Sequence, residues 1–207
     1  MRFASFADDA IVAGKVRPFL GVIPPAGLTP RFRGEWTGVW EQYVVDNVIP
    51  WVDQHLPALR SRAARAIGGL SAGGYGAANM GLRDPGLFGT IESWSGSFTA
   101  PRDGSLRHAS AEELVANDPT ILVEREAAVL RRLGTRFFLS CGTGDPGNLV
   151  HSVEFGRLLS ALRIRHRTFF VPGGHNGRFW EAQLPAALRY AFPVGTPPFL
   201  ATAAQRA

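Results

Sequence analysis

A serine flanked by glycines has the surroundings in this chain that best suit covalent chemistry. Residues 65–80 read RAIGGLSAGGYGAANM and place Ser71 inside the pattern Gly69-x-Ser71-x-Gly73. A short apolar run precedes the serine, and small residues typical of a helix follow it. A sharp strand-to-helix turn would lift the hydroxyl above a sheet edge, and we expect a Cβ at either glycine to strike a neighbouring element. The first helical N–H groups, starting with Ala72, would then face an oxyanion formed there.

A serine hydroxyl becomes a useful nucleophile only when a base takes its proton. The chain has five histidines, and His175 differs from the others in its context. It follows the apolar run 168–171 and the turn Pro172-Gly-Gly, so we expect it on a loop at the carboxyl end of the last strand. Active sites of parallel sheets gather at that edge. The remaining four fit surface or capping positions: His55, His108, His151 and His166.

The imidazole needs a carboxylate on its far nitrogen, and Asp145 is the best-placed candidate. It lies in the segment CGTGDPG, directly after the apolar run 136–141. The chain order Ser71, Asp145, His175 is the order of α/β-hydrolases. An aspartate before Pro-Gly is also an ordinary turn residue, so its assignment depends on the other two. Three carboxylates are weaker alternatives: Glu154 in a helix, Asp118 as a helix cap, and Glu92.

Apolar runs alternate with helix-length segments, which is typical of a parallel sheet joined by helices. The expected strands are 19–23, 66–70, 90–94, 136–141 and 167–171. Helical periodicity covers residues 36–59, with a kink or break at Pro50. Further helices are expected at 73–83, 111–116, 121–133, 151–162 and 179–190. The sequence thus predicts an α/β fold in one domain over residues 1–192, followed by a tail at 193–207.

Composition excludes several other classes of protein. The formal net charge is +5, carried mostly by arginines spread along the chain, with Lys15 the only lysine. Nucleic-acid binding would need a concentrated basic patch with interleaved aromatics, which is absent. The single cysteine, Cys141, excludes an internal disulfide and a cysteine-based zinc site and is expected to be a buried thiol. We expect no metal or cofactor. No apolar run of membrane-spanning length and no signal peptide at Met1 are present, so the chain as written is expected to be soluble.

The chain resembles the putative-esterase family of α/β-hydrolases, which includes S-formylglutathione hydrolases, feruloyl esterases, enterochelin esterases and mycolyltransferases. The resemblance covers residues 10–192. Its markers are GVIPPAG at 21–27, Ile49-Pro50, GLSAGGYGA at 69–77, DPGLF at 84–88, Ser95-Gly96, GTGD at 142–145, GGHN at 173–176 and Trp180. The resemblance implies a mainly parallel sheet flanked by helices, with Ser71 as nucleophile, Asp145 as acid and His175 as base.

Members of that family have further strands before the segment matching residues 10–18, and one of them ends in a turn that supplies an oxyanion N–H. We therefore expect the fold to be N-terminally incomplete, either because the natural protein begins upstream or because this is a truncated paralogue. Ala72 is then the one clear oxyanion donor, and an unpaired sheet edge could drive self-association. A segment upstream would also make an extracytoplasmic location possible.

The predicted function is a serine esterase that cleaves a small-molecule ester through an acyl-enzyme on Ser71. Two alternatives stay open. One is a mycolyltransferase-like acyltransferase that uses the same three residues, and the other is a truncated, non-catalytic domain. Five aromatic residues could line an acyl pocket or simply belong to the core: Trp36, Trp40, Trp94, Phe98 and Trp180.

Overall fold

A parallel four-stranded sheet lies at the centre of the protein, whose computed structural model describes residues 2–24, 36–102 and 106–195. The strands are β1 (Ala66–Leu70), β2 (Thr90–Trp94), β3 (Arg136–Gly142) and β4 (Arg165–Val171). Each strand pairs with the next one along the chain, in the order β1-β2-β3-β4. The carboxyl ends of all four strands therefore meet at one edge of the sheet.

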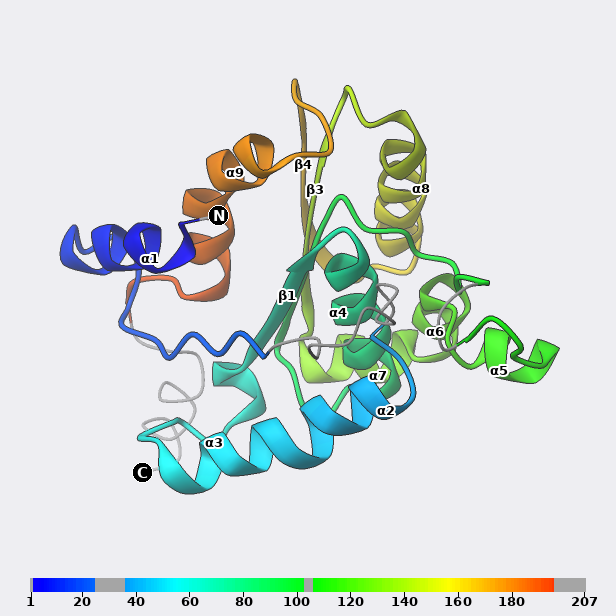
Figure 1. Cartoon of the computed structure of the whole chain (residues 1–207), viewed down its shortest axis with the longest axis horizontal. Helices are drawn as coiled ribbons and strands as arrows, with labels where there is room; N and C mark the ends of the chain where they lie inside the picture. Colours follow the sequence, from blue (N-terminus) through cyan, green and yellow to red (C-terminus); the bar gives the residue numbers. More distant parts are fainter. Residues whose placement is uncertain (1, 25–35, 103–105, 196–207) are drawn as a thin grey trace.

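Helices cover both faces of this sheet (Figure 1). α4 packs against β1 and β2, and α8 packs against β3 and β4. On the opposite face α9 contacts β2 and β3, and α1 packs against α9. The longer helices are α1 (Phe3–Val12), α4 (Ala72–Arg83), α8 (Pro146–Ala161) and α9 (Gly177–Ala191). The shorter ones are α2 (Val39–Gln42), α3 (Ile49–His55), the 3₁₀ turn η2 (Arg62–Ala64), α5 (Ala111–Val115), α6 (Pro119–Arg125) and α7 (Ala127–Leu133).

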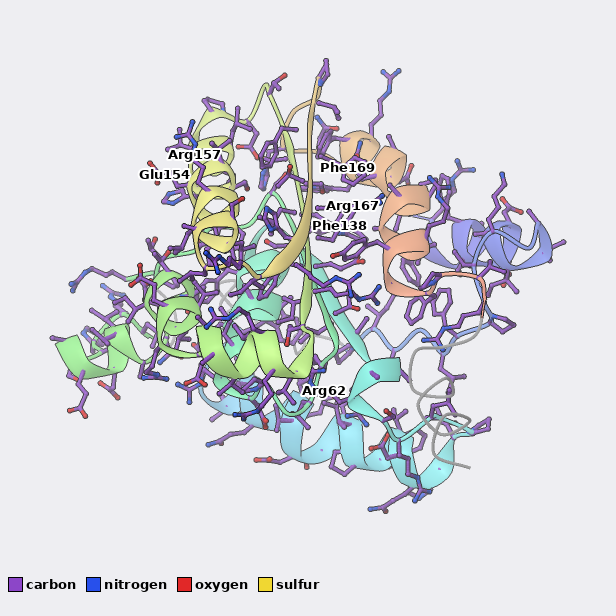
Figure 2. All side chains as sticks on the ribbon, turned by 180° about the vertical axis from the view of Figure 1, so that it is seen from behind. Arg62, Phe138, Glu154, Arg157, Arg167 and Phe169 are labelled. Carbon is purple, nitrogen blue, oxygen red and sulfur yellow. The ribbon has the colours of Figure 1, made fainter. Side chains whose placement is uncertain are left out.

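Successive side chains of each strand point to opposite faces of the sheet, so the core is divided into two layers. Ile91, Phe137 and Leu139 are fully buried toward α4, α6, α7 and α8. The neighbouring strand residues face the other way, and Phe138 packs with Phe169 at a ring distance of 5.0 Å beneath α9 (Figure 2). Apolar side chains of the central strands β2 and β3 thus pack under helices on both faces, as expected of a parallel sheet covered by helices.

Four of the five expected strands are confirmed, but the strand expected at residues 19–23 is wrong. Residues 17–24 form neither helix nor strand. Apolar composition alone does not make a strand, because a strand also needs a hydrogen-bonded neighbour. This segment instead packs against the end of α9, where Phe19 stacks on Phe192 at 4.2 Å. Leu20, Val22 and Ile23 are left 46%, 45% and 73% exposed.

The helix expected around Pro50 continues through the proline but changes its type. α2 leads into a π-helix, η1 (Tyr43–Val48), and then into α3. Proline removes the N–H that would bond to the carbonyl four residues earlier and crowds that carbonyl, and the wider π turn relieves both effects. The helix expected at 121–133 is instead two helices, α6 and α7, which part at Glu126. The helix α1 lies in a segment for which the sequence predicted no element.

Glu92 is a buried carboxyl group in the middle of β2. It is 5% exposed and lies on the α9 side of the sheet. Burial raises the pKa of Glu92 to about 8, although the nearby Trp94 side chain and the Arg136 charge act in the opposite direction. In the unfolded chain this carboxyl ionises near its ordinary pKa. The free energy of unfolding must therefore fall as the pH rises from about 4.5 to 8, because the unfolded state binds fewer protons there.

We predict that Glu92→Gln removes this pH dependence. Each unit of pKa difference is worth about 1.4 kcal/mol, so between pH 5.5 and 7.5 the parent should lose roughly 3 kcal/mol more stability than the variant. Urea unfolding at both pH values measures the difference. Glu154→Gln, on the outer face of α8 (Figure 2), is the control and should keep the parent slope. Equal slopes for parent and Glu92→Gln would show that Glu92 is ionised when folded.

Candidate active site

Ser71 occupies the turn between β1 and α4 and has a positive φ of 54°. Its N–H donates to the Trp94 carbonyl at 2.8 Å, and its own carbonyl accepts from Gly74 and Tyr75. A left-handed conformation is unfavourable for a residue with a Cβ, so the surrounding bonds must hold it. The turn projects the serine side chain beyond the end of the strand, as the glycine pattern predicts.

The two glycines that flank Ser71 have different roles. A Cβ at Gly69 would overlap the backbone carbonyl group of Gly73, because the first turn of α4 crosses directly over the strand. A Cβ at Gly73 would meet only the Trp36 Nε1 atom, at 4.0 Å, among the described residues. The expectation that both positions exclude a side chain is therefore right for Gly69 and wrong for Gly73.

Three side chains from different strand ends form one hydrogen-bonded chain. The Nε2 atom of His175 lies 2.9 Å from the Ser71 hydroxyl oxygen. Its Nδ1 atom lies 2.7 Å from Oδ2 of Asp145. Asp145 follows β3, and His175 follows β4. The structure thus brings together the serine, histidine and aspartate that the sequence singled out.

The loops after β3 and β4 fit against each other closely. The Thr143 N–H donates to the Val171 carbonyl at 2.9 Å, and the Gly144 N–H donates to the Gly173 carbonyl at 2.7 Å. A Cβ at Gly142 would overlap the same Gly173 carbonyl. Glycine at 142 therefore allows the two loops to approach each other, and this contact sets the distance between Asp145 and His175.

Solvent exposure differs strongly across the hydrogen-bonded chain. The His175 side chain is 37% exposed and the Asp145 side chain 9%. Burial alone would raise the pKa of Asp145, but hydrogen bonds from His175 and Asn148 outweigh it and hold the pKa below its usual range. Asp145 is therefore ionised near neutral pH. No sequence pattern singles out Asn148 as a partner of this carboxylate.

The alternative candidates lie away from Ser71 or have structural roles. Glu92 is central in β2, and Glu154 is exposed on α8. Asp118 caps α6 by accepting from the Thr120 and Ile121 N–H groups, as expected of a cap. The His55 and His166 rings contact backbone carbonyls of Trp51 and Ile164. No group of residues that could hold a metal ion occurs in the described ranges.

The aromatic candidates divide between the core and the site. Phe98 is 1% exposed and stacks on Phe155 at 4.0 Å, and Trp94 is buried under α9. Trp180 instead makes an edge contact with the His175 ring, at 5.0 Å between centroids. Its indole N–H donates to the Ser95 hydroxyl at 3.2 Å. Cys141 is buried beside Asp145, which agrees with the expected buried thiol.

The chain belongs to an esterase family. The profile of the family described as "Putative esterase" matches residues 29–191. Esterase Rv1288 of Mycobacterium tuberculosis is 28% identical over an alignment of 200 positions, and the match covers 80% of this chain and 43% of that protein. The chain therefore spans less than half the length of this relative.

Solved structures share the fold. A ferulic acid esterase is 24% identical and superposes with a TM-score of 0.77 over 92% of this chain and 76% of that chain. The enterobactin esterase FES from Shigella flexneri is 21% identical, with a TM-score of 0.69 over 88% of this chain and 46% of its own. These likenesses define an α/β-hydrolase fold, as the sequence predicted.

We predict that Gly69→Ala and Gly73→Ala differ sharply. The added methyl at Gly69 must displace the first turn of α4, so we expect a loss of roughly 2 kcal/mol or more in unfolding free energy. Gly73→Ala should change it by less than about 1 kcal/mol, since alanine suits a helix and finds open space. Urea titrations compare the two variants. Equal destabilisation would contradict the close approach of Gly69 and Gly73.

Proposed function

We propose that this protein is a serine carboxylic-ester hydrolase. Ser71 is the nucleophile, His175 the general base, and Asp145 the residue that orients the base. The observation that carries the proposal is the continuous hydrogen-bonded chain from Ser71 Oγ through the imidazole to Asp145. It lies at the carboxyl edge of the sheet, where parallel α/β folds hold their sites. Membership of the esterase family supports the same conclusion.

The proton positions follow from the geometry. Nε2 can accept the serine proton only if Nδ1 carries the ring proton, and Asp145 stabilises that tautomer by accepting from Nδ1. As Ser71 attacks the ester carbonyl, its proton moves to Nε2 and the ring becomes an imidazolium. The ionised Asp145 then lies 2.7 Å from the positive ring and lowers its energy. His175 next gives the proton to the leaving alcohol, and an acyl-enzyme on Ser71 remains.

Ala72 is the proposed oxyanion donor. It is the first residue of α4, so its N–H has no acceptor within the helix. The helix dipole adds positive potential at this end. Donation from this N–H to the carbonyl oxygen would stabilise the charge that develops during attack.

Release of the acyl group determines the class of reaction. Water attacking the acyl-enzyme gives an esterase, and His175 can activate that water as it activated the serine. A sugar or other alcohol in the same position would give the acyltransferase alternative. We favour hydrolysis, because the relatives described above are named as esterases. The proposed substrate class is a small-molecule carboxylic ester.

The first prediction for this function is that a fluorophosphonate probe labels Ser71 covalently. Only a serine activated by a neighbouring base reacts readily with such a probe. Peptide mapping by mass spectrometry locates the adduct. Ser71→Ala should lose the label, while Ser95→Ala, at another turn serine with positive φ, should keep it. Labelling of Ser71→Ala at the parent rate would contradict the assignment, and a chain that takes no label would favour the non-catalytic alternative.

We also propose that the protein self-associates through the side of the sheet that β1 borders. In the part of the chain that the structure describes, β1 pairs only with β2, and Gly68 in its middle is exposed. Exposed strand edges favour pairing with another chain. A groove of about 520 Å³ lies between residues 21–24 and the helices η1 and α3 and is lined mainly by apolar side chains, among them Ile23 and Trp51.

The described helices include none long and apolar enough to cross a membrane.

Light scattering after size-exclusion chromatography tests this proposal. We expect the mass of the parent to rise with concentration and Ile23→Lys to reduce that rise, because a charge in the groove opposes apolar contact. Val12→Lys is a matched control, since Val12 is 88% exposed on α1. A parent that stays monomeric at all concentrations would contradict self-association. If Ile23→Lys and Val12→Lys reduced the rise in mass equally, the contact between copies would not involve the groove.

A further inference from the structure

The environment of the Asp145 carboxylate contains a residue with no assigned role. Three side chains approach it: His175, Asn148 and the Cys141 thiol. The Asn148 Nδ2 atom lies 3.0 Å from Oδ1 and 3.1 Å from Oδ2, so one amide group spans both carboxylate oxygens. Cys141 is farther away, with its sulfur 3.8 Å from Oδ2. Asn148 is therefore the second strong hydrogen-bond donor to this carboxylate after His175.

The start of α8 makes this contact unusual. Asp145 is the N-cap residue of the helix, and an aspartate there normally accepts from the first backbone N–H groups. Its side chain makes no cap hydrogen bond of full geometry, although the Asn148 backbone N–H also helps to lower the pKa of Asp145. The carboxylate is directed to the imidazole, and the side chain of Asn148, in the first turn of α8, bonds to it. The hydrogen bonds of full geometry from this helix turn to the carboxylate thus come from the Asn148 side chain.

We propose that Asn148 is a positioning residue that holds the Asp145 carboxylate ionised and aimed at Nδ1 of His175. This proposal rests on the proposed function. Asn148 has no direct contact with the serine in the hydrogen-bonded chain and acts through Asp145. An amide is suited to this position, because it donates to both oxygens and adds no charge to the site.

The hydrogen positions are consistent with this role. Asn148 Nδ2 is also 3.3 Å from Nδ1 of His175. With the ring proton on Nδ1, both nitrogens are donors and cannot bond to each other, so the amide hydrogens are left for the carboxylate oxygens. When Nε2 takes the serine proton, the carboxylate faces a positive ring. Donation from Asn148 then favours the charged carboxylate over a neutral carboxylic acid, so the Nδ1 proton stays on the ring.

Asn148→Leu tests the positioning, since it keeps the approximate size and removes the donor. We expect kcat on p-nitrophenyl butyrate to fall about 10–100-fold, the worth of one hydrogen bond to a charged group, with KM within about threefold of the parent. Asp145→Asn is the reference variant. We expect its kcat to fall about 10⁴-fold, because the His175 ring would adopt the wrong tautomer. If Asn148→Leu keeps kcat within threefold while Asp145→Asn loses it, Asn148 does not position Asp145. If neither variant loses activity, another carboxylate orients His175, and the roles proposed for Asp145 and Asn148 both fail. A parent without turnover on the ester would instead contradict the proposed function.

Asn148→Asp tests the electrostatics and remains informative if the leucine variant does not fold. A second carboxylate about 3 Å from the first repels it, so the pair keeps a proton to higher pH, and once ionised the pair stabilises the positive imidazolium. Because the base must be neutral to act, the acidic limb of the kcat/KM profile should move to higher pH by at least about one unit. The titratable groups facing this position are Asp145, His175 and the Cys141 thiol, whose pKa burial raises. An unshifted acidic limb in Asn148→Asp would overturn the proposal. Glu154→Gln on the same helix is the control and should leave the profile unchanged.

Discussion

Parallel pairing of the four strands is the constraint on which the site depends. Since β1, β3 and β4 end at the same edge, residues far apart in the chain emerge within hydrogen-bonding distance of one another. His175 reaches Ser71 across 104 positions of sequence. The loops that carry Asp145 and His175 are joined by backbone bonds and pass each other at glycines. The geometry of the site is therefore set mainly by backbone packing.

Features that destabilise the folded state are concentrated at the carboxyl edge of the sheet and inside β2. Ser71 and Ser95 both hold positive φ angles at the ends of adjacent strands, and each directs its N–H to the carbonyl of the next strand. Glu92 places an ionisable group inside the sheet. Such features destabilise a fold and persist only where the surrounding packing over-determines them. The two core layers supply that packing, with phenylalanines on both faces of β3.

Much of this arrangement could be predicted from the sequence. β1 and β2 have the predicted bounds, while β3 extends one residue further and β4 begins two residues earlier than expected. Short apolar runs between helical segments are best explained as strands of a parallel sheet. Polar residues directly after these runs indicate a candidate active site at the carboxyl edge. The segment at 19–23 has the same composition, but strand pairing depends on neighbours that composition does not reveal. The π turn before Pro50 and the free space at Gly73 likewise depend on tertiary contacts.

Asn148 illustrates what a single sequence cannot reveal. It lies three residues after Asp145, as in many helix starts. Only the orientation of the two side chains shows that Asn148 donates to the Asp145 carboxylate and that this carboxylate faces His175. Trp180 is similar, because its contact with His175 depends on how α9 crosses the sheet. Residues that act through others carry weak sequence signals, since their chemistry is common and their geometry is not local.

The proposed mechanism depends on an acyl-enzyme formed on Ser71. Rapid-quench mixing of the protein with p-nitrophenyl butyrate, followed by peptide mapping, measures this intermediate directly. We expect an early release of p-nitrophenolate up to one equivalent and a butyryl group on the peptide that contains Ser71, with both absent in Ser71→Ala. Turnover without an adduct on Ser71, or an undiminished rate in Ser71→Ala, would contradict it.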